Sequence, residues 1–368
     1  SSMLIKTNQN VTEVDVLAAL RDFIFPLFGA SLIELDAVQL LHLENGRMVI
    51  HLNLPAGLLS LHGRLVLMIQ NQLESAGIYG VQVVINGDTR RDNFDFSVAG
   101  ARVRNILLVA SGKGGVGKSS TAINLALALR ADGATVGVLD ADIYGPSMRT
   151  MLGVSEAIKP VLVNENYLEP IRKYGLATMS VGYLSPDKTP MIWRGPMAVK
   201  ALQQLLEQTL WGDLDYLIID MPPGTGDIHI SLAQKLNRAA ALVVTTPQEV
   251  ALIDARKGLE MFNKVGIPVL GIVENMATHV CSRCGFEDDI FGAHGAAKMA
   301  DAYGVAMLGS LPLDKKIREH LDSGLPSVAR DPTSNLSQHY AALAQRIAVA
   351  SWKAKLTSTS VPQIEIAS

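Results

Sequence analysis

A glycine-rich segment between an apolar run and a helical pattern carries the residues best suited to bind phosphate. Residues 112–119 have the spacing G-x-x-x-x-G-K-[ST] of nucleotide-binding loops. Glycines lack a Cβ, so backbone N–H groups can surround phosphate oxygens, and the next helix points its positive N-terminus at the same anion. Lys118 is placed to reach the outer phosphates, and the Ser119 hydroxyl to ligate Mg²⁺. The alternative is a flexible turn, which the flanking strand and helix patterns argue against.

This loop holds most of the expected nucleotide-binding residues. They are Gly112, Lys113, Gly114, Gly115, Val116, Gly117, Lys118, Ser119 and Ser120. Lys113 is a second lysine inside the loop, and taken alone it fits an ordinary solvated side chain.

Acidic residues follow two other apolar runs. Asp140 and Asp142 come after residues 135–139, and Asp220 ends the run that begins at Tyr216. In a parallel sheet the ligand lies beyond the carboxyl ends of the strands, so these carboxylates should face the phosphate loop. Asp220 can hold Mg²⁺ through water, whereas Asp140 has helix capping as an equally favoured role.

The segment after Asp220 reads Met-Pro-Pro-Gly-Thr-Gly-Asp. Gly224 could place its N–H on the γ-phosphate, as a switch that depends on the nucleotide state. A rigid proline turn would explain the prolines but not the acid before them. The base is expected to be adenine, because Asn263-Lys264-Val265-Gly266 lacks the final acid of the guanine-binding pattern Asn-Lys-x-Asp.

The sequence contains two cysteines, Cys281 and Cys284, and Gly285 follows them. This spacing is typical of a turn whose N–H groups support two thiolate ligands of one metal or cluster. A redox pair, inert buried cysteines and a structural zinc with His279 are the alternatives. One subunit cannot complete an all-thiolate site, but two symmetry-related subunits can, so the pair favours a homodimer.

Alternating apolar runs and helical patterns from residue 105 onward predict an α/β fold, in which helices cover both faces of a mostly parallel sheet. Helices are expected to start near 118, 197, 228, 249 and 295. The expected strands are 106–110, 135–139, 177–182, 216–219, 241–245, 269–273 and 307–311.

The first ninety residues predict a separate small α+β domain of order α-β-β-α-β, with an Asn45-Gly46 hairpin turn. It contains no cysteine and no clustered carboxylates, and we expect no catalytic role for it. The predicted organisation is a small domain at 1–90, a linker at 91–104, the nucleotide-binding domain at 105–352 and a tail at 353–368.

Composition limits the class of partner. A net charge of −3 gives no excess of positive charge to attract nucleic acid. No apolar run is long enough to span a bilayer. We therefore expect a cytoplasmic protein with no nucleic-acid or membrane partner.

Taken together, these segments resemble the Mrp/ApbC family of iron–sulfur cluster carriers, a branch of the MinD/ParA-type ATPases with a deviant Walker A loop. The resemblance covers about residues 100–350, and the first domain weakly resembles the MIP18-like domain often fused ahead of this family. The matching segments are Ser-Gly-Lys-Gly-Gly-Val-Gly-Lys-Ser-Ser (111–120), Leu-Asp-Ala-Asp-Ile-Tyr-Gly-Pro-Ser (139–147), Trp-Arg-Gly-Pro-Met (193–197), Asp-Met-Pro-Pro-Gly-Thr-Gly-Asp (220–227), Glu-Asn-Met (274–276) and Cys-x-x-Cys-Gly (281–285).

The resemblance implies a homodimeric ATPase that holds a bridging [4Fe–4S] cluster on Cys281 and Cys284 and passes it to apo-proteins. It implies slow hydrolysis of ATP with Mg²⁺, with catalytic roles for Lys113, Lys118, Asp142 and Asp220. In the family, the first loop lysine reaches the partner's nucleotide and the switch aspartate, here Asp142, orients water. Asn275 matches the position that reads adenine. A partitioning ATPase of the same superfamily and an ATPase with a purely structural zinc are the alternatives.

Overall fold

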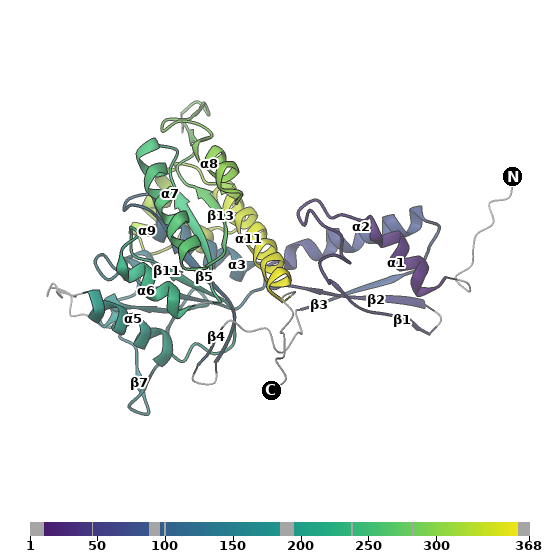
Figure 1. Ribbon diagram of the computed structural model, residues 1–368, viewed down its shortest axis with the longest axis horizontal. Helices are drawn as coiled ribbons and strands as arrows, with labels where there is room; N and C mark the ends of the chain where they lie inside the picture. The colour runs from purple at the N-terminus through teal and green to yellow at the C-terminus, as the bar shows by residue number, and fades with distance from the viewer. Residues whose placement is uncertain are drawn as a thin grey trace, which may run out of the picture. The chain divides into compact units, whose positions relative to one another are not determined.

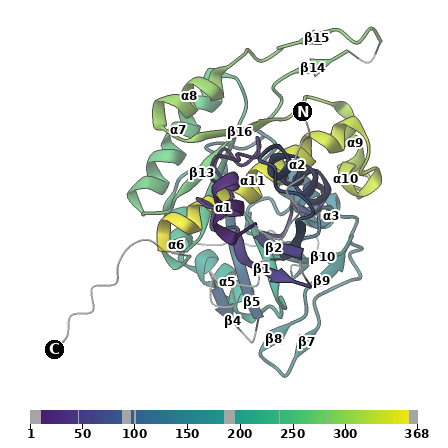
Figure 2. The same ribbon diagram turned by 90° about the vertical axis from the view of Figure 1, so that its right-hand side faces the viewer.

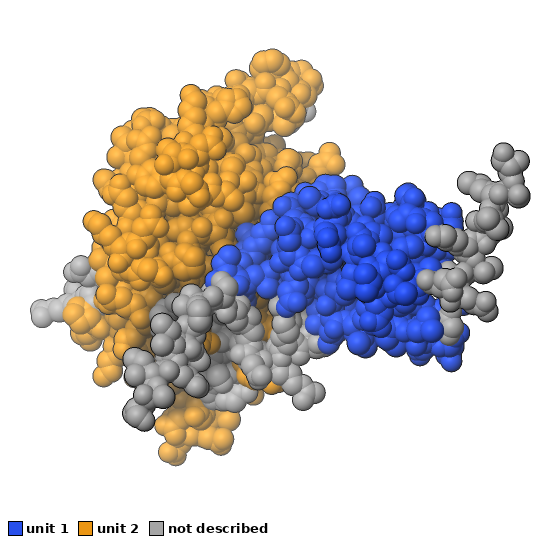
Figure 3. Space-filling view, turned by 45° about the vertical axis from the view of Figure 1, so that its right-hand side comes forward, with its two compact units in different colours: residues 1–91, 348–368 blue, residues 92–347 orange. Residues whose placement is uncertain are grey.

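The structure, a computed structural model, describes residues 11–45, 47–87, 96–98, 101–184, 195–236, 238–281 and 283–359. Gly46 of the predicted hairpin turn, Trp193 and Arg194 of the family segment, and the predicted tail from residue 360 onward lie outside these ranges. The contacts divide the chain into unit 1, Ser1–Arg91 with Ala348–Ser368, and unit 2, Asp92–Ile347 (Figure 3).

Unit 1 is built from the predicted order of elements. Thr12 and Asp15 form a capping box at the start of the first helix, which buries Val16 and Leu20. The first two strands pair antiparallel, and the third joins the second in parallel. The elements are α1 (Glu13–Arg21), β1 (Val38–Glu44), β2 (Arg47–Leu54), the 3₁₀ turn η2 (Leu59–Leu61), α2 (His62–Ser75) and β3 (Gln82–Gly87).

Unit 2 is a large sheet whose strand order is β16-β13-β12-β5-β11-β6-β10-β9, with β4 paired to β5. The pairings from β16 through to β10 are all parallel, and β9 and β4 are antiparallel to their neighbours. The sheet strands are β4 (Phe96–Val98), β5 (Ala101–Ala110), β6 (Val136–Asp140), β9 (Ile171–Lys173), β10 (Leu176–Ser180), β11 (Leu214–Asp220), β12 (Ala240–Thr245), β13 (Val269–Glu274) and β16 (Ala306–Ser310).

Two small hairpins stand apart from this sheet. They pair β7 (Leu162–Val163) with β8 (Tyr167–Leu168), and β14 (His279–Val280) with β15 (Glu287–Asp288). The helical elements are α3 (Lys118–Ala131), α4 (Met148–Met151), η3 (Val181–Tyr183), α5 (Gly195–Gln208), α6 (Asp227–Lys235), α7 (Glu249–Lys264), α8 (Gly295–Tyr303), α9 (Lys315–Asp322), α10 (Ser327–Arg330) and α11 (Asn335–Thr359).

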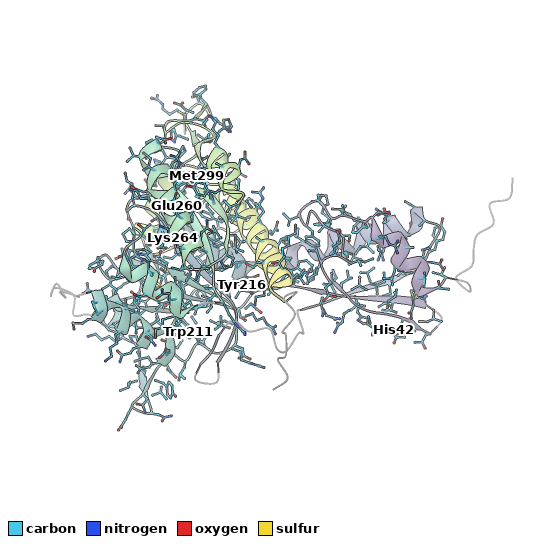
Figure 4. All side chains as sticks on the ribbon, viewed as in Figure 1. His42, Trp211, Tyr216, Glu260, Lys264 and Met299 are labelled. Carbon is cyan, nitrogen blue, oxygen red and sulfur yellow. The ribbon has the colours of Figure 1, made fainter. Side chains whose placement is uncertain are left out.

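Helices cover both faces of the large sheet. Helices α5, α6, α7 and α8 lie on one face, and α3 and α10 lie on the other (Figures 1 and 2). Central strands such as β6 and β11 are therefore almost continuously buried, as expected for parallel strands covered on both sides. Trp211 and Tyr216, near the start of β11, are each 1% exposed (Figure 4).

The fold class predicted from the sequence is confirmed, and the strands expected in the nucleotide-binding domain all form. The prediction missed β4, β7, β8, β9, β14 and β15. The predicted linker, 91–104, contains β4 and the first residues of β5. The predicted domain end at 352 falls within α11, whereas the division of contacts falls after Ile347. Across the described ranges, no helix is both long and apolar enough to cross a membrane.

Candidate functional site

The predicted nucleotide-binding residues gather at one edge of the large sheet because parallel strands end there together. Asp220 of β11 lies opposite Asp140 of β6 and opposite Val109 of β5 in the strand register. The phosphate loop follows β5, and Asn275 follows β13 directly. This edge is the one at which open α/β sheets bind ligands.

The phosphate loop has the backbone geometry that its glycines allow. Gly115 and Gly117 adopt φ of +84° and +82°, in the left-handed region that favours glycine. Gly112 is required for a different reason, because a Cβ there would lie 2.1 Å from the carbonyl carbon of Asp254 in α7. Helix α3 begins at Lys118, so its N-terminus faces the loop.

A cavity of about 190 Å³ lies inside this loop. Lys113, Gly114 and Gly115 are exposed, Val116 is buried, and Ser119 and Ser120 are partly buried. Asp142 and Pro223, which lie outside the loop in sequence, also line the cavity. The lining residues are Ser111, Lys113, Gly114, Gly115, Gly117, Lys118, Ser119, Ser120, Asp142, Met151 and Pro223.

Lys118 and Asp220 form a buried ion pair beside this cavity. Their side chains are 6% and 2% exposed, and the Lys118 ammonium also donates to the Ser119 hydroxyl at 3.3 Å. Burial raises the pKa of Asp220, and the Lys118 charge opposes that shift. The pair brings together three of the predicted site residues, Lys118, Ser119 and Asp220.

Asp140 is a buried hydrogen-bond acceptor rather than a free carboxylate at the cavity. It accepts from the backbone N–H groups of Asp142 at 3.1 Å and Met148 at 3.3 Å, and from the Ser180 hydroxyl at 3.0 Å. Because Met148 is the first residue of α4, the capping role considered for Asp140 is present. Burial, with the nearby Asp220 charge, raises the pKa of Asp140 to about 7.

Asp142 is the carboxylate of this segment that lines the phosphate cavity. Its oxygen accepts from the Gly145 backbone N–H at 3.3 Å, which leaves other lone pairs of the carboxylate for a ligand or water.

Gly224 lies near the phosphate loop with its N–H directed at a protein acceptor. The N–H donates to the Ser111 carbonyl at 3.0 Å, and Gly224 has φ of +100°. A Gly224 N–H that binds a γ-phosphate would therefore have to leave Ser111. This exchange of acceptors is compatible with the predicted switch.

His229, which the sequence prediction did not select, supports the segment that carries Gly224. It is 3% exposed, and its Nε2 donates to the Pro222 carbonyl at 2.6 Å. Its Nδ1 has no hydrogen-bond partner among the described residues, and burial lowers the pKa of the ring. His229 belongs to no sequence motif, so its contact with Pro222 could not be predicted from the sequence.

Asn275 joins the phosphate loop to a larger cavity. Its side-chain amide donates to the Val116 carbonyl at 2.9 Å, and a Cβ on Gly117 would lie 2.1 Å from the same nitrogen. This contact uses the amide nitrogen of Asn275 and not its amide oxygen. Asn275 is thus held at the junction of the loop and the space beside it.

This larger cavity has a volume of about 760 Å³ and shares Gly117, Ser120 and Met151 with the phosphate cavity. Its size and position suit the nucleoside part of a nucleotide. Much of its wall was not predicted, because it comes from α9 and the segments after β13 and β16. The unpredicted lining residues are Pro146, Ser147, Thr150, Met151, Met276, His279, Ile290, Pro312, Leu313, Asp314, Lys315, Ile317, Arg318, Leu321 and Asp322.

Cys281 and Cys284 lie on the turn between β14 and β15, and their thiols are free. Cys281 donates its N–H to Phe286 and accepts from the Gly285 N–H, each at 2.9 Å. Hydrogen bonds from the N–H groups of Arg283 and Cys284 lower the pKa of the Cys281 thiol. Within the described residues, no group of three or more His, Cys, Asp and Glu side chains could hold a metal ion.

Comparison with known proteins identifies relatives along most of the chain. Residues 102–348 match the ParA family described as NUBPL iron-transfer P-loop NTPase. An iron–sulfur cluster carrier protein of Escherichia coli K12 is 58% identical over 246 residues, which cover 67% of this chain and 66% of that protein. The matched region therefore spans slightly less than two thirds of the bacterial relative.

Two further matches extend this result. An iron–sulfur cluster carrier protein of Deinococcus radiodurans is 41% identical over 335 residues, covering 90% of this chain and 94% of that protein. A solved nucleotide-binding protein of Archaeoglobus fulgidus in complex with ADP is 32% identical, with a TM-score of 0.55. That match covers 65% of this chain and 92% of the solved chain.

Proposed function

The chain belongs to the ParA-type iron-transfer P-loop NTPases, and from that membership we propose that it binds and hydrolyses ATP and carries an iron–sulfur cluster to apo-proteins. The two halves of the proposal rest on different parts of unit 2. ATP would occupy the two joined cavities at the carboxyl edge of the sheet. The cluster would bind to the cysteine turn beyond β14.

The phosphate cavity supports the first half. The loop N–H groups and Lys118 would hold the phosphates, while Ser119 and Asp220 would hold Mg²⁺, Asp220 through water. Asp142 would orient the attacking water. Lys113 is exposed on the loop, where it could reach the nucleotide of a second subunit. Its role depends on the proposed dimer.

The larger cavity supports ATP as the nucleotide. Asn275 is fixed by Val116, so that its amide oxygen can accept a hydrogen bond from the amino group of adenine. Leu313, Ile317 and Leu321 give this cavity an apolar wall for the base.

The single observation that carries the second half is the cysteine turn itself. Backbone N–H groups hydrogen-bond the Cys281 thiol and favour the thiolate, which is the form that binds iron. The sequence has only these two cysteines. A four-thiolate [4Fe–4S] cluster would therefore need two copies of the chain, which supports a homodimer with a bridging cluster.

Anaerobic reconstitution tests this proposal directly. Iron and sulfide should reach about one [4Fe–4S] cluster per dimer, the value set by four thiolates per cluster. The loaded protein should then convert an apo iron–sulfur protein to its active form. A full cluster on a monomer, or no cluster on the dimer, would contradict the bridging arrangement.

A structural zinc is the second candidate, and His279 gives it a specific basis. Its Nδ1 donates to the Leu313 carbonyl at 3.1 Å, so Nε2 would be the ring atom that binds zinc, two residues before Cys281. Metal analysis of protein purified without air distinguishes the two, because a carrier should contain iron and sulfide rather than zinc.

A further inference from the structure

Helices α4 and α9 both contribute to the wall of the nucleoside cavity. Thr150 and Met151 of α4 line it, and so do Leu321 and Asp322 at the end of α9. Met151 lines the phosphate cavity as well. The separation of these two helices therefore helps to set the width of the space for a nucleoside.

Both helices end in the same kind of turn, which contains a left-handed glycine. After α4, Gly153 has φ of +61°, and the N–H of the next residue donates to the Arg149 carbonyl at 2.9 Å. After α9, Gly324 has φ of +72°, and the N–H of the next residue donates to the His320 carbonyl at 3.0 Å. This is the Schellman arrangement of a helix C-terminus, in which the left-handed residue is usually glycine.

The two glycines contact each other backbone to backbone. A Cβ on Gly324 would lie 2.4 Å from the Gly153 Cα, and a Cβ on Gly153 would lie 2.9 Å from the Gly324 carbonyl oxygen. Both distances are shorter than a Cβ can approach a backbone atom. A side chain at either position would therefore force the ends of α4 and α9 apart.

Tyr174 and its neighbour join this contact from a third segment. The Tyr174 hydroxyl donates to the Gly324 carbonyl at 2.5 Å, and the Lys173 ammonium donates to the Gly153 carbonyl at 3.4 Å. Tyr174 and Gly175 form the two-residue turn between β9 and β10, with φ of +49° and +76°. A left-handed conformation is strained for tyrosine, and such strain is concentrated at ligand clamps and other functional positions. The turn thus holds the ends of both helices.

We propose that this contact, made by Gly153, Gly324 and Tyr174, fixes the separation of α4 and α9 and so determines how tightly the cavity holds the nucleoside of a nucleotide. None of the three is among the described residues that line the cavity. They are positioning residues, which act through the two helices. The inference rests on the proposed nucleotide site and does not involve the cysteine turn.

Binding of ADP and of pyrophosphate to the full chain, measured by calorimetric titration with Mg²⁺ present, tests the proposal. Pyrophosphate can occupy the phosphate loop but carries no nucleoside. Gly324→Ala should weaken ADP binding about tenfold, because the added methyl group separates the two backbones and displaces the cavity wall that they carry. Pyrophosphate binding should change little.

Gly304→Ala is the matched control for the backbone conformation. Gly304 ends α8 with φ of +63°, and the next N–H donates to the Ala300 carbonyl at 3.0 Å. A Cβ there would meet none of the described atoms outside its own helix within 4 Å. Gly304→Ala should lose stability through the strained conformation and keep its affinity for ADP. Urea unfolding of both glycine variants shows that they are folded and compares their losses of stability.

Tyr174→Phe tests the same contact without a change of backbone conformation. Loss of one hydrogen bond should weaken ADP binding about threefold and leave pyrophosphate binding unchanged. Tyr167→Phe, which changes an exposed tyrosine of β8, should bind both ligands as the unaltered chain does.

Three outcomes would overturn the inference. Gly324→Ala could bind ADP as tightly as the unaltered chain, Gly304→Ala could weaken ADP binding to the same extent, or pyrophosphate binding could weaken as much as ADP binding. Each of these outcomes leaves the proposed binding of ATP intact. Failure of the unaltered chain to bind ADP would overturn the proposed function and this inference together.

Discussion

At the scale of single residues, the buried pair of Lys118 and Asp220 has the largest expected effect. Removing one member of such a pair leaves the other charge buried without compensation. Lys118→Ala should therefore abolish ATP hydrolysis and lower the free energy of unfolding by about 3 kcal/mol. A steady-state ATPase assay and urea unfolding measure the two effects.

Two further variants separate catalysis from stability. Adding Asp220→Asn to Lys118→Ala should recover part of the lost stability without restoring hydrolysis, since the uncompensated carboxylate is gone. Lys113→Ala, which changes an exposed lysine of the same loop, should leave stability unchanged. Normal hydrolysis by Lys118→Ala would show that this loop is not the catalytic one.

The raised pKa of Asp140 should make the stability of the protein depend on pH. Its pKa in the folded protein is raised to about 7 from an ordinary value of 3.8, so the folded state binds more protons than the unfolded state between these values. The contribution of Asp140 to stability should therefore fall as the pH rises from about 4 to 7 and level off above that range.

Urea unfolding without nucleotide, at intervals between pH 5 and pH 8, measures this dependence. Asp140→Asn should flatten the decline in the unfolding midpoint, because its side chain does not titrate. Equal slopes for the variant and the unaltered protein would exclude Asp140 as the source of the decline.

At the scale of elements, α6 and the loop before it depend on His229. His229→Leu removes the donor to the buried Pro222 carbonyl, which should cost on the order of 1–3 kcal/mol of stability and lower kcat for ATP. His229→Gln keeps a donor near the same position and should retain most of both. Thermal unfolding and ATPase kinetics compare the variants. Equal losses of stability and kcat in His229→Leu and His229→Gln would show that packing of the ring, and not its hydrogen bond, supports this segment.

The elements that sequence reasoning found are those with long apolar runs or a clear helical period. The strands of the parallel sheet belong to this group, and so does the phosphate loop, whose spacing alone locates Lys118. The hairpins β7–β8 and β14–β15 were missed, because strands of two residues leave no period to detect.

Much of the nucleoside cavity was missed for another reason. Leu313 and Leu321 line it only because α9 and the segment before it pack beside Asn275, and such tertiary placement leaves no local pattern. The sequence could not decide whether Asp140 faces the phosphate loop or caps a helix, because this too depends on tertiary placement. Its hydrogen bonds to Met148 and Ser180 depend on neighbours 8 and 40 residues away.

At the scale of the whole molecule, the proposed dimer makes a prediction about shared catalytic sites. If Lys113 acts on the partner's nucleotide, Lys113→Ala and Asp142→Ala should each be impaired alone. In a mixed dimer, one of the two sites holds an intact Asp142 and the partner's intact lysine. Statistical mixing should thus recover up to about a quarter of the activity. Mixtures no more active than the separate variants would argue against a shared site.

The dimer also predicts how the cysteine variants behave. Cys281→Ala or Cys284→Ala should each abolish cluster binding after reconstitution, because each removes two thiolates from the pair of chains. ADP binding should survive, since neither cysteine lines the nucleoside cavity. Iron analysis and equilibrium binding of ADP measure the two properties. A single-cysteine variant with a full cluster would require other ligands, with His279 the first to test.

Gly112, the first glycine of the loop motif, is needed for the packing of the protein as well as for the shape of a phosphate-binding loop. A Cβ there would clash with the backbone of α7 at Asp254. A glycine at this position is therefore needed for the close packing of α7 against the loop. This requirement does not depend on whether nucleotide is hydrolysed. Two proteins could share this glycine after one has lost catalysis, so the glycine alone does not identify an active ATPase.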